Sequence, residues 1–160
     1  MENLKFIIIF VAMLFIFGAV EIVKEEKPTR IIIAGSRNYS DYTVIKSFSY
    51  GIINKLNLSP ENIEIVSGGC YGVDKLAEKF SDEYGFIFTE FPANWSLGKR
   101  AGYERNKQMA KYAAEENGIL IVFWDYKSKG TKLMLNLAKE YGLKRYVINI
   151  NTMEFLELSE

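Results

Sequence analysis

The chain has 160 residues, of which 49% are hydrophobic and 25% are charged, a length that suits one globular domain with its own apolar core. Its 20 Lys and Arg residues balance 20 Asp and Glu residues, so net charge offers nucleic acid no general attraction and argues against it as a partner. With one cysteine, Cys70, and no histidine, the sequence excludes a disulfide framework, zinc sites built from Cys and His, and imidazole catalysis. Carboxylates, lysines and tyrosines remain as acid–base groups, and we expect neither a metal nor a cofactor.

Residues 6–20 form an apolar run without a charged or hydrogen-bonding side chain, at the lower limit of length for a bilayer span. Three interpretations stay open: a short membrane anchor, a secretory signal, or an extra buried element. We favour the anchor, and the excess of cations after the run then leaves the main domain in the cytoplasm. Residues 1–29 are thus predicted to be this segment with a polar linker, residues 30–150 the domain, and residues 151–160 a tail.

From residue 30 onward, short apolar runs alternate with segments of helical periodicity. The runs are rich in Ile, Val and Phe and are bounded by Gly, Ser or Pro, which is typical of buried parallel strands. They cover residues 31–34, 63–66, 87–91, 119–124 and 146–150. Apolar residues three and four positions apart predict helices within 44–56, 73–80, 103–113 and 133–141. We therefore predict an α/β fold, a Rossmann-like, three-layer parallel sheet of about five strands with helices on both faces, preceded by the apolar segment.

In such a sheet, ligands bind at the carboxyl ends of the strands, so the loops there are the candidates. After the first strand, Gly35, Ser36 and Arg37 combine a tight turn, a hydroxyl group and a guanidinium suited to phosphate. After the second, a glycine-rich stretch opens a helix, whose free N–H groups favour an anion. Its candidate residues are Gly68, Gly69, Gly72 and Asp74. Asp74 is expected to cap the helix, bind a ribose hydroxyl or polarise water, and Cys70 to be a packed side chain.

The third and fourth loops also have residues suited to a phosphate-bearing ligand. Trp95 offers an aromatic face, and the glycines and cations after it lead to Arg105 and Asn106. Ser128, Gly130 and Thr131 open the last predicted helix with hydroxyl and N–H groups. Each loop alone has an ordinary explanation as a turn, a cap or a solvated surface. Together the four loops predict one anion-binding pocket.

These motifs, in this order, resemble the YspA-type (cpYpsA-related) branch of the SLOG superfamily over about residues 30 to 150. The stretches that carry the resemblance are 35–37, 68–74, 92–95, 98–106 and 128–131. The resemblance implies a Rossmann-like domain that binds nucleotides or nucleotide-derived small molecules, as a sensor in phage or conflict systems, and it implies pairing of two copies. Relatives include the LOG-type phosphoribohydrolases and DNA-processing protein A. The hydrolytic relatives carry a Pro-Gly-Gly-x-Gly-Thr-x-x-Glu signature, whereas here Met134 stands where the glutamate would be.

Three functions follow. The leading one is a ligand-binding module for a nucleotide-like small molecule. The alternative is a nucleoside 5'-monophosphate phosphoribohydrolase, an N-glycosidic hydrolase in which Asp74 or Glu104 assists water and stabilises the positive charge that develops on the sugar. The second alternative is single-stranded nucleic-acid binding, with Trp95 and Tyr71 as stacking platforms and Lys99 and Arg100 beside Arg105 as a cationic track.

Overall fold

The structure is a computed structural model that describes residues 27–158. The apolar segment 6–20 lies outside the described residues. Within 27–158, no helix combines the length and the hydropathy that crossing a membrane requires.

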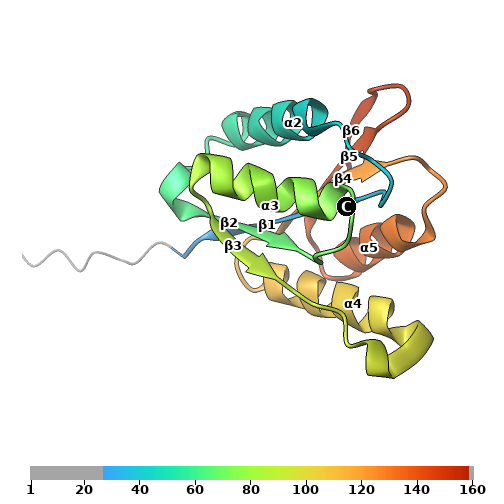
Figure 1. The fold of residues 1–160 in the computed structure, drawn as a ribbon. Helices are drawn as coiled ribbons and strands as arrows, with labels where there is room; N and C mark the ends of the chain where they lie inside the picture. The colour runs from blue at the N-terminus through green and yellow to red at the C-terminus, as the bar shows by residue number, and fades with distance from the viewer. Residues whose placement is uncertain (1–26, 159–160) are drawn as a thin grey trace, which may run out of the picture.

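Six strands form one sheet in the order β3-β2-β1-β4-β5-β6. Their bounds are β1 Thr29–Gly35, β2 Ile63–Ser67, β3 Ile87–Glu90, β4 Ile119–Trp124, β5 Lys144–Asn149 and β6 Phe155–Leu158. The first five run parallel, and Ile31 in the central strand lies opposite Ile65 on one side and Ile119 on the other. β6 pairs with β5 in the antiparallel direction. Figure 1 shows the helices on the two faces of this sheet.

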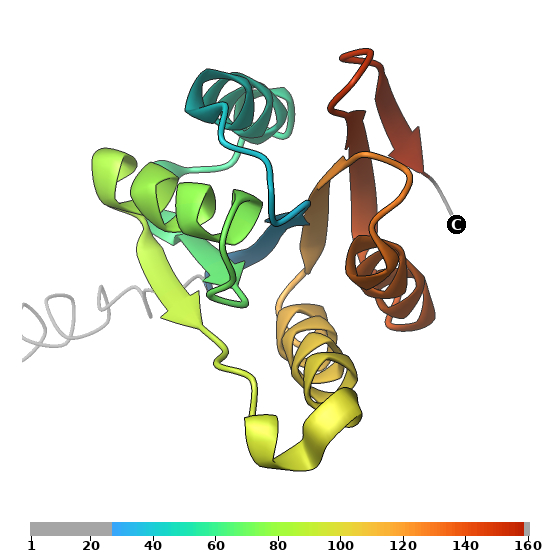
Figure 2. The same cartoon turned by 45° about the vertical axis from the view of Figure 1, so that its right-hand side comes forward.

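Two helices cover each face, which confirms the predicted α/β architecture. α2 (Tyr42–Lys55) and α3 (Val73–Tyr84) lie on one face, and α4 (Ala101–Ala114) and α5 (Lys129–Glu140) lie on the other (Figure 2). Successive residues of β1 pack on opposite faces of the sheet. Ile31 and Ile33 belong to the apolar core beneath α2 and α3, and Ile32 belongs to the core beneath α4 and α5. All three isoleucines are fully buried, as continuous apolar strands in a parallel sheet should be.

The strand order creates a crevice at the carboxyl ends of β1 and β4. The chain leaves β1 toward α2 on one face of the sheet and leaves β4, its neighbour, toward α5 on the other. The loops after these two strands therefore diverge, and the space between them is where parallel α/β sheets bind their ligands.

A buried ionic network fastens α4 to the sheet. The Glu64 side chain on β2 accepts hydrogen bonds from the Arg30 Nε at 3.0 Å, the Thr89 hydroxyl at 2.6 Å and the Tyr112 hydroxyl at 2.8 Å. The Arg30 guanidinium also lies 3.5 Å from the centroid of the Tyr112 ring. Glu64 is only 4% exposed, so each of these partners compensates for burial of its charge.

Two segments differ from the sequence-based expectation. Residues 95–100, expected as a loop rich in glycine and cations, form the 3-10 helix η2 (Trp95–Arg100), which continues into α4 (Figure 2). Part of the predicted tail forms β6, which extends the expected five strands to six.

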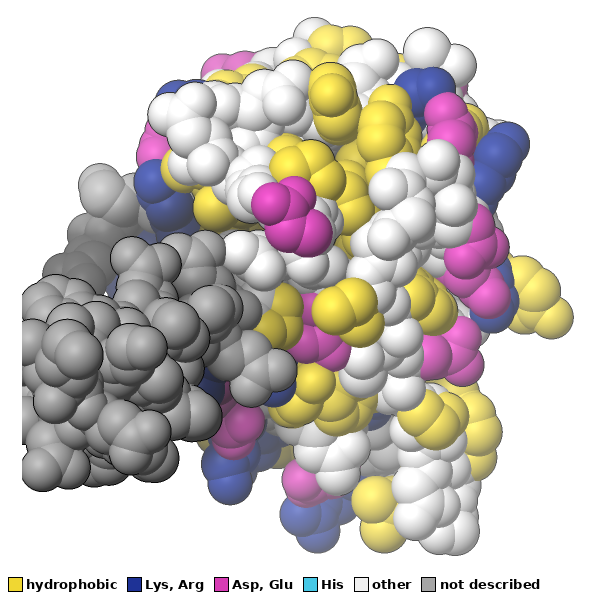
Figure 3. Space-filling view, turned by 90° about the vertical axis from the view of Figure 1, so that its left-hand side faces the viewer, with side chains coloured by type: hydrophobic (Ala, Val, Ile, Leu, Met, Phe, Trp, Pro, Cys, Tyr) yellow, Lys and Arg dark blue, Asp and Glu magenta, His cyan; other side chains and the backbone are white. Residues whose placement is uncertain are grey.

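On the face drawn in Figure 3, acidic, basic and hydrophobic side chains are interspersed, in keeping with the zero net charge.

Candidate functional site

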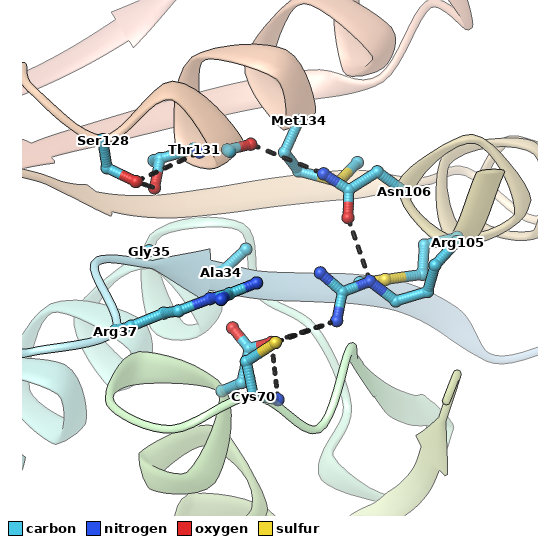
Figure 4. Close-up of a pocket in the computed structure, with 12 residues that line it drawn as sticks. Ala34, Gly35, Arg37, Cys70, Arg105, Asn106, Ser128, Thr131 and Met134 are labelled. Carbon is cyan, nitrogen blue, oxygen red and sulfur yellow. Dashed lines mark hydrogen bonds and ion pairs between the residues drawn. The ribbon is translucent and has the colours of Figure 1, made fainter. Parts of the chain in front are cut away.

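A pocket opens at the carboxyl ends of the strands, between the amino ends of α3 and α5 and the second turn of α4 (Figure 4). Its enclosed volume is about 50 Å³. Twelve residues from the four loops and adjoining helices line it: Ala34, Gly35, Arg37, Cys70, Asp74, Arg105, Asn106, Met109, Ser128, Gly130, Thr131 and Met134. The four stretches that the sequence singled out therefore meet at one place.

Two glycines allow the first two loops to approach each other. A Cβ atom on Gly72 would lie 2.4 Å from the carbonyl oxygen of Ser36 and 2.5 Å from the backbone of Arg37. Gly72 also has φ of 76° and ψ of −130°, a conformation that is essentially restricted to glycine. At Gly35, a Cβ atom would lie 2.2 Å from the carbonyl oxygen of Phe123. These positions require glycine for backbone packing, which sets the shape of the pocket wall.

Arg105 is held in place by the glycine-rich loop and by its own neighbour. Its Nη1 donates to the carbonyl oxygen of Gly68 at 2.6 Å and contacts the Cys70 sulfur at 3.2 Å. Its Nε donates to the Asn106 side chain at 3.1 Å, and that side chain in turn donates to the carbonyl oxygen of Gly130 at 3.4 Å. The side chain is only 10% exposed. The guanidinium is thus buried and fixed in orientation before any ligand arrives.

Asp74 is the carboxylate among the lining residues, and it is 6% exposed. Its Oδ2 accepts a hydrogen bond from the Cys70 N–H at 3.2 Å and lies 3.9 Å from Arg105 Nη1. Burial raises the pKa of this carboxyl group to about 6, although Arg105 and the Cys70 N–H favour the charged form. Above that pH the pocket therefore contains one buried negative charge.

Arg37 contributes a second guanidinium from the opposite wall. Figure 4 shows its side chain extending across the pocket toward Arg105. The side chain is exposed, and its positive charge acts to lower the pKa of Asp74. With two arginines against one carboxylate, the pocket is positive when Asp74 is ionised, and its charge favours an anion.

The amino end of α5 closes the pocket on the side of β4. Ser128 caps the helix, and its hydroxyl accepts a hydrogen bond from the Thr131 hydroxyl at 2.9 Å. The Asp125 carboxylate accepts the Ser128 N–H at 2.7 Å, which fixes the turn before the helix. A Cβ atom on Gly130 would meet nothing within 4 Å, so the space beside this residue is open.

The structure brings eight of the predicted site residues into the pocket lining: Gly35, Arg37, Asp74, Arg105, Asn106, Ser128, Gly130 and Thr131. Four others, Ser36, Gly68, Gly69 and Gly72, belong to the loops that carry this lining. Trp95 and Glu104 are not among the lining residues. Trp95 is 65% exposed on η2, and Glu104 forms an ion pair with Arg100 at 3.0 Å.

Sequence reasoning did not assign four of the lining residues to the site: Ala34, Cys70, Met109 and Met134. Ala34 and Met109 have the apolar spacing of core positions, and Cys70 has no histidine to mark it as reactive. Met134 stood out only because the hydrolytic signature has glutamate there. They share no local sequence signal: Ala34 lies near the carboxyl end of β1 and Cys70 in the loop after β2, whereas Met109 and Met134 lie within α4 and α5.

The amino-acid sequence of this chain is similar to one protein-family model and to a phage protein. The model of the YspA, cpYpsA-related SLOG family matches residues 29–98, the segment that holds Arg37 and Asp74. The Gene 61 protein of Mycobacterium phage D29 is 29% identical over 120 residues, which are 71% of this chain and 91% of the phage protein.

The fold of this chain is also similar to that of a solved structure. DNA processing protein A (DprA) from Streptococcus pneumoniae superposes with a TM-score of 0.58 at 17% identity, over 76% of this chain. The match covers 50% of DprA, so this chain spans about half of that protein's length. At this identity the likeness concerns the fold alone. The family match confirms, over residues 29–98, the resemblance that the motifs led us to expect: this segment is similar to the YspA, cpYpsA-related SLOG family.

Proposed function

We propose that this chain binds the phosphate group of a nucleotide or nucleotide-derived small molecule in the pocket, as a ligand-binding module. The observation that carries the proposal is the pair of guanidinium groups, Arg37 and Arg105, which face one pocket that contains a single carboxylate. A guanidinium matches a phosphate geometrically, because its N–H groups pair with two oxygens at once.

The helix ends add further donors for the same anion. α3 begins at the pocket without a side-chain cap. The Val73 N–H donates to the Ser36 carbonyl oxygen at 3.3 Å, so the later N–H groups of the first turn and the partial positive charge there favour an anion. The enclosed volume of about 50 Å³ is small beside the ~300–1,000 Å³ of pockets that enclose an entire drug-sized ligand. A phosphate therefore suits the enclosed part, and the sugar and base of a nucleotide would lie outside it.

Calorimetric titration of the full-length chain with AMP and with ADP-ribose tests this proposal. Arg37→Ala is the cleaner variant, because Arg37 is exposed and the described part of the chain shows no hydrogen bond from it. Arg105→Ala should weaken binding by about 2–5 kcal/mol if the ion pair with phosphate is desolvated. Arg100→Ala is the matched control, since Arg100 lies outside the pocket and pairs with Glu104. Unchanged affinity in both pocket variants, with folding intact, would remove the pocket from the function.

The phosphoribohydrolase alternative has less support. Asp74 lines the pocket, but Glu104 does not, and the residue at the signature glutamate position is Met134, a lining residue without a carboxylate. We expect the chain to bind AMP without releasing adenine. Adenine release that Asp74→Asn abolishes would favour the hydrolase instead.

A second candidate, single-stranded nucleic-acid binding, is favoured by η2. Trp95 and Leu97 are 65% and 48% exposed there, next to Lys99 and Arg100, and the fold resembles that of a DNA processing protein. Aromatic faces beside cations suit a single strand. If this candidate is right, oligonucleotide affinity falls steeply with salt and Trp95→Ala weakens it.

A further inference from the structure

The glycine-rich loop between β2 and α3 carries an aromatic side chain that the pocket itself does not use. Tyr71 is 83% exposed, the largest exposed fraction among the large hydrophobic side chains of the described chain. Within residues 27–158, no hydrogen bond, ion pair or ring contact involves it. The ring is therefore largely accessible to a ligand.

The neighbours of Tyr71 place it at the rim of the pocket. Cys70, immediately before it, lines the pocket and contacts Arg105. Gly72, immediately after it, packs against the backbone of Ser36 and Arg37. Tyr71 thus stands between the two walls that present the guanidinium groups.

The loop that carries Tyr71 is anchored on both sides. A Cβ atom on Gly69 would lie 2.5 Å from the exposed Glu90 carboxylate group on β3, and one on Gly72 would lie 2.4 Å from the Ser36 carbonyl oxygen in the loop after β1. The Asp74 side chain accepts the Cys70 N–H, and the Ser67 hydroxyl donates to the Asp74 carbonyl oxygen at 3.1 Å. Because the backbone of this loop is already held in place, it loses little conformational freedom when a planar group stacks on the Tyr71 ring.

We propose that Tyr71 is the residue that recognises the base, and that the ligand is consequently a base-bearing nucleotide rather than a bare sugar phosphate. This inference rests on the proposed function, since it requires the phosphate to occupy the pocket. The enclosed space of about 50 Å³ suits a phosphate and not the whole nucleotide, so a base attached through ribose would lie outside it, and no aromatic residue is among the lining residues. Other exposed rings are less suited: Tyr126 already stacks on Trp124 at 4.4 Å, and Trp95 lies on η2 outside the pocket lining.

The test compares AMP with ribose 5-phosphate, which shares the phosphate and the sugar but lacks the base. The full-length wild type should bind AMP more tightly, and Tyr71→Ala should lose this preference by roughly 5- to 150-fold, the range for removal of a base-stacking aromatic. Affinity for ribose 5-phosphate should stay unchanged. Tyr71→Phe, which keeps the ring, should retain the preference. Tyr50→Ala is the control, because Tyr50 is a 41% exposed tyrosine of α2 outside the pocket lining.

Each outcome decides between the two proposals. If Tyr71→Ala keeps the preference for AMP, or if wild type binds both compounds equally, the role of Tyr71 is wrong while phosphate binding stands. If wild type binds neither compound, the proposed function itself is wrong. Loss of the preference in Tyr71→Ala alone supports the inference.

Discussion

Replacing Asp74 with Asn removes the one titrating carboxylate from the pocket while keeping a side-chain oxygen that can accept the Cys70 N–H. In the folded chain, burial raises the pKa of Asp74 from 3.8 to about 6. A carboxyl pKa that is higher in the folded than in the unfolded state means that folding favours the protonated form. The folded state is therefore most favoured below the unfolded pKa, and this contribution is lost as pH rises through the folded pKa.

The magnitude follows from the two pKa values. Their difference corresponds to ~3 kcal/mol at about 1.36 kcal/mol per pKa unit. Integrating over a practical window, from about pH 4.5 to about pH 7.5, leaves ~2 kcal/mol of change. Over that window, the wild type should lose ~2 kcal/mol in free energy of unfolding relative to Asp74→Asn.

Urea unfolding of the full-length chain, followed by tryptophan fluorescence at several pH values, measures this difference. Asp125→Asn is the control of opposite sign. Partial burial opposes ionisation of Asp125, but the N–H groups of Ser128 and Lys127 outweigh it and lower its pKa. Its stabilising effect is lost only as pH falls through that lowered pKa, so the wild type should stay more stable than Asp125→Asn by a constant amount across the window. A stability difference between wild type and Asp74→Asn that does not change with pH would refute the reasoning.

Three further results are expected. Sulfate, which keeps its double charge throughout, should bind wild type several-fold more tightly as pH falls below the pKa of Asp74, with no such trend in Asp74→Asn; a flat wild-type profile in calorimetry would contradict this. Gly72→Ala should destabilise the fold by at least ~1–3 kcal/mol because of its backbone conformation, whereas Gly51→Ala, in open space within α2, should stabilise it by ~0.5–1 kcal/mol; urea unfolding that reverses this order would argue against the loop packing. Glu64→Ala should cost about 3–5 kcal/mol because it leaves a buried charged partner unpaired, and Glu78→Ala, at a partly exposed ion pair with Lys75, less than about 1 kcal/mol; equal losses in the same assay would contradict a stabilising role for the network.

The parallel core was predictable because its strands have a local sequence pattern, a short apolar run, that can be recognised without knowledge of the fold. Runs such as 119–124 are apolar at every position, and Gly85 ends α3 in the left-handed conformation that glycine favours. The convergence of the loops followed from topology, since parallel strands bring their carboxyl ends to one edge. β6 was not predicted, because a four-residue edge strand of mostly exposed residues has no local signature and depends on pairing with β5.

The path of the chain after β3 could also not be predicted from the sequence pattern. The glycines and cations around Gly98 suggested a phosphate loop, and Gly98 does adopt a positive φ of 57°. That residue is the kink within η2, which continues into α4, and Trp95 stays outside the pocket lining. Composition indicates that a segment turns and carries charge, whereas only packing determines which way its side chains face.

A crystal structure of the full-length chain with AMP tests the central claim most directly. We expect the phosphate to lie between the guanidinium groups of Arg37 and Arg105, within hydrogen-bonding distance of both, at the amino ends of α3 and α5. AMP bound elsewhere, for example on η2 beside Trp95, would contradict it, and so would a vacant pocket at a nucleotide concentration that saturates binding in solution.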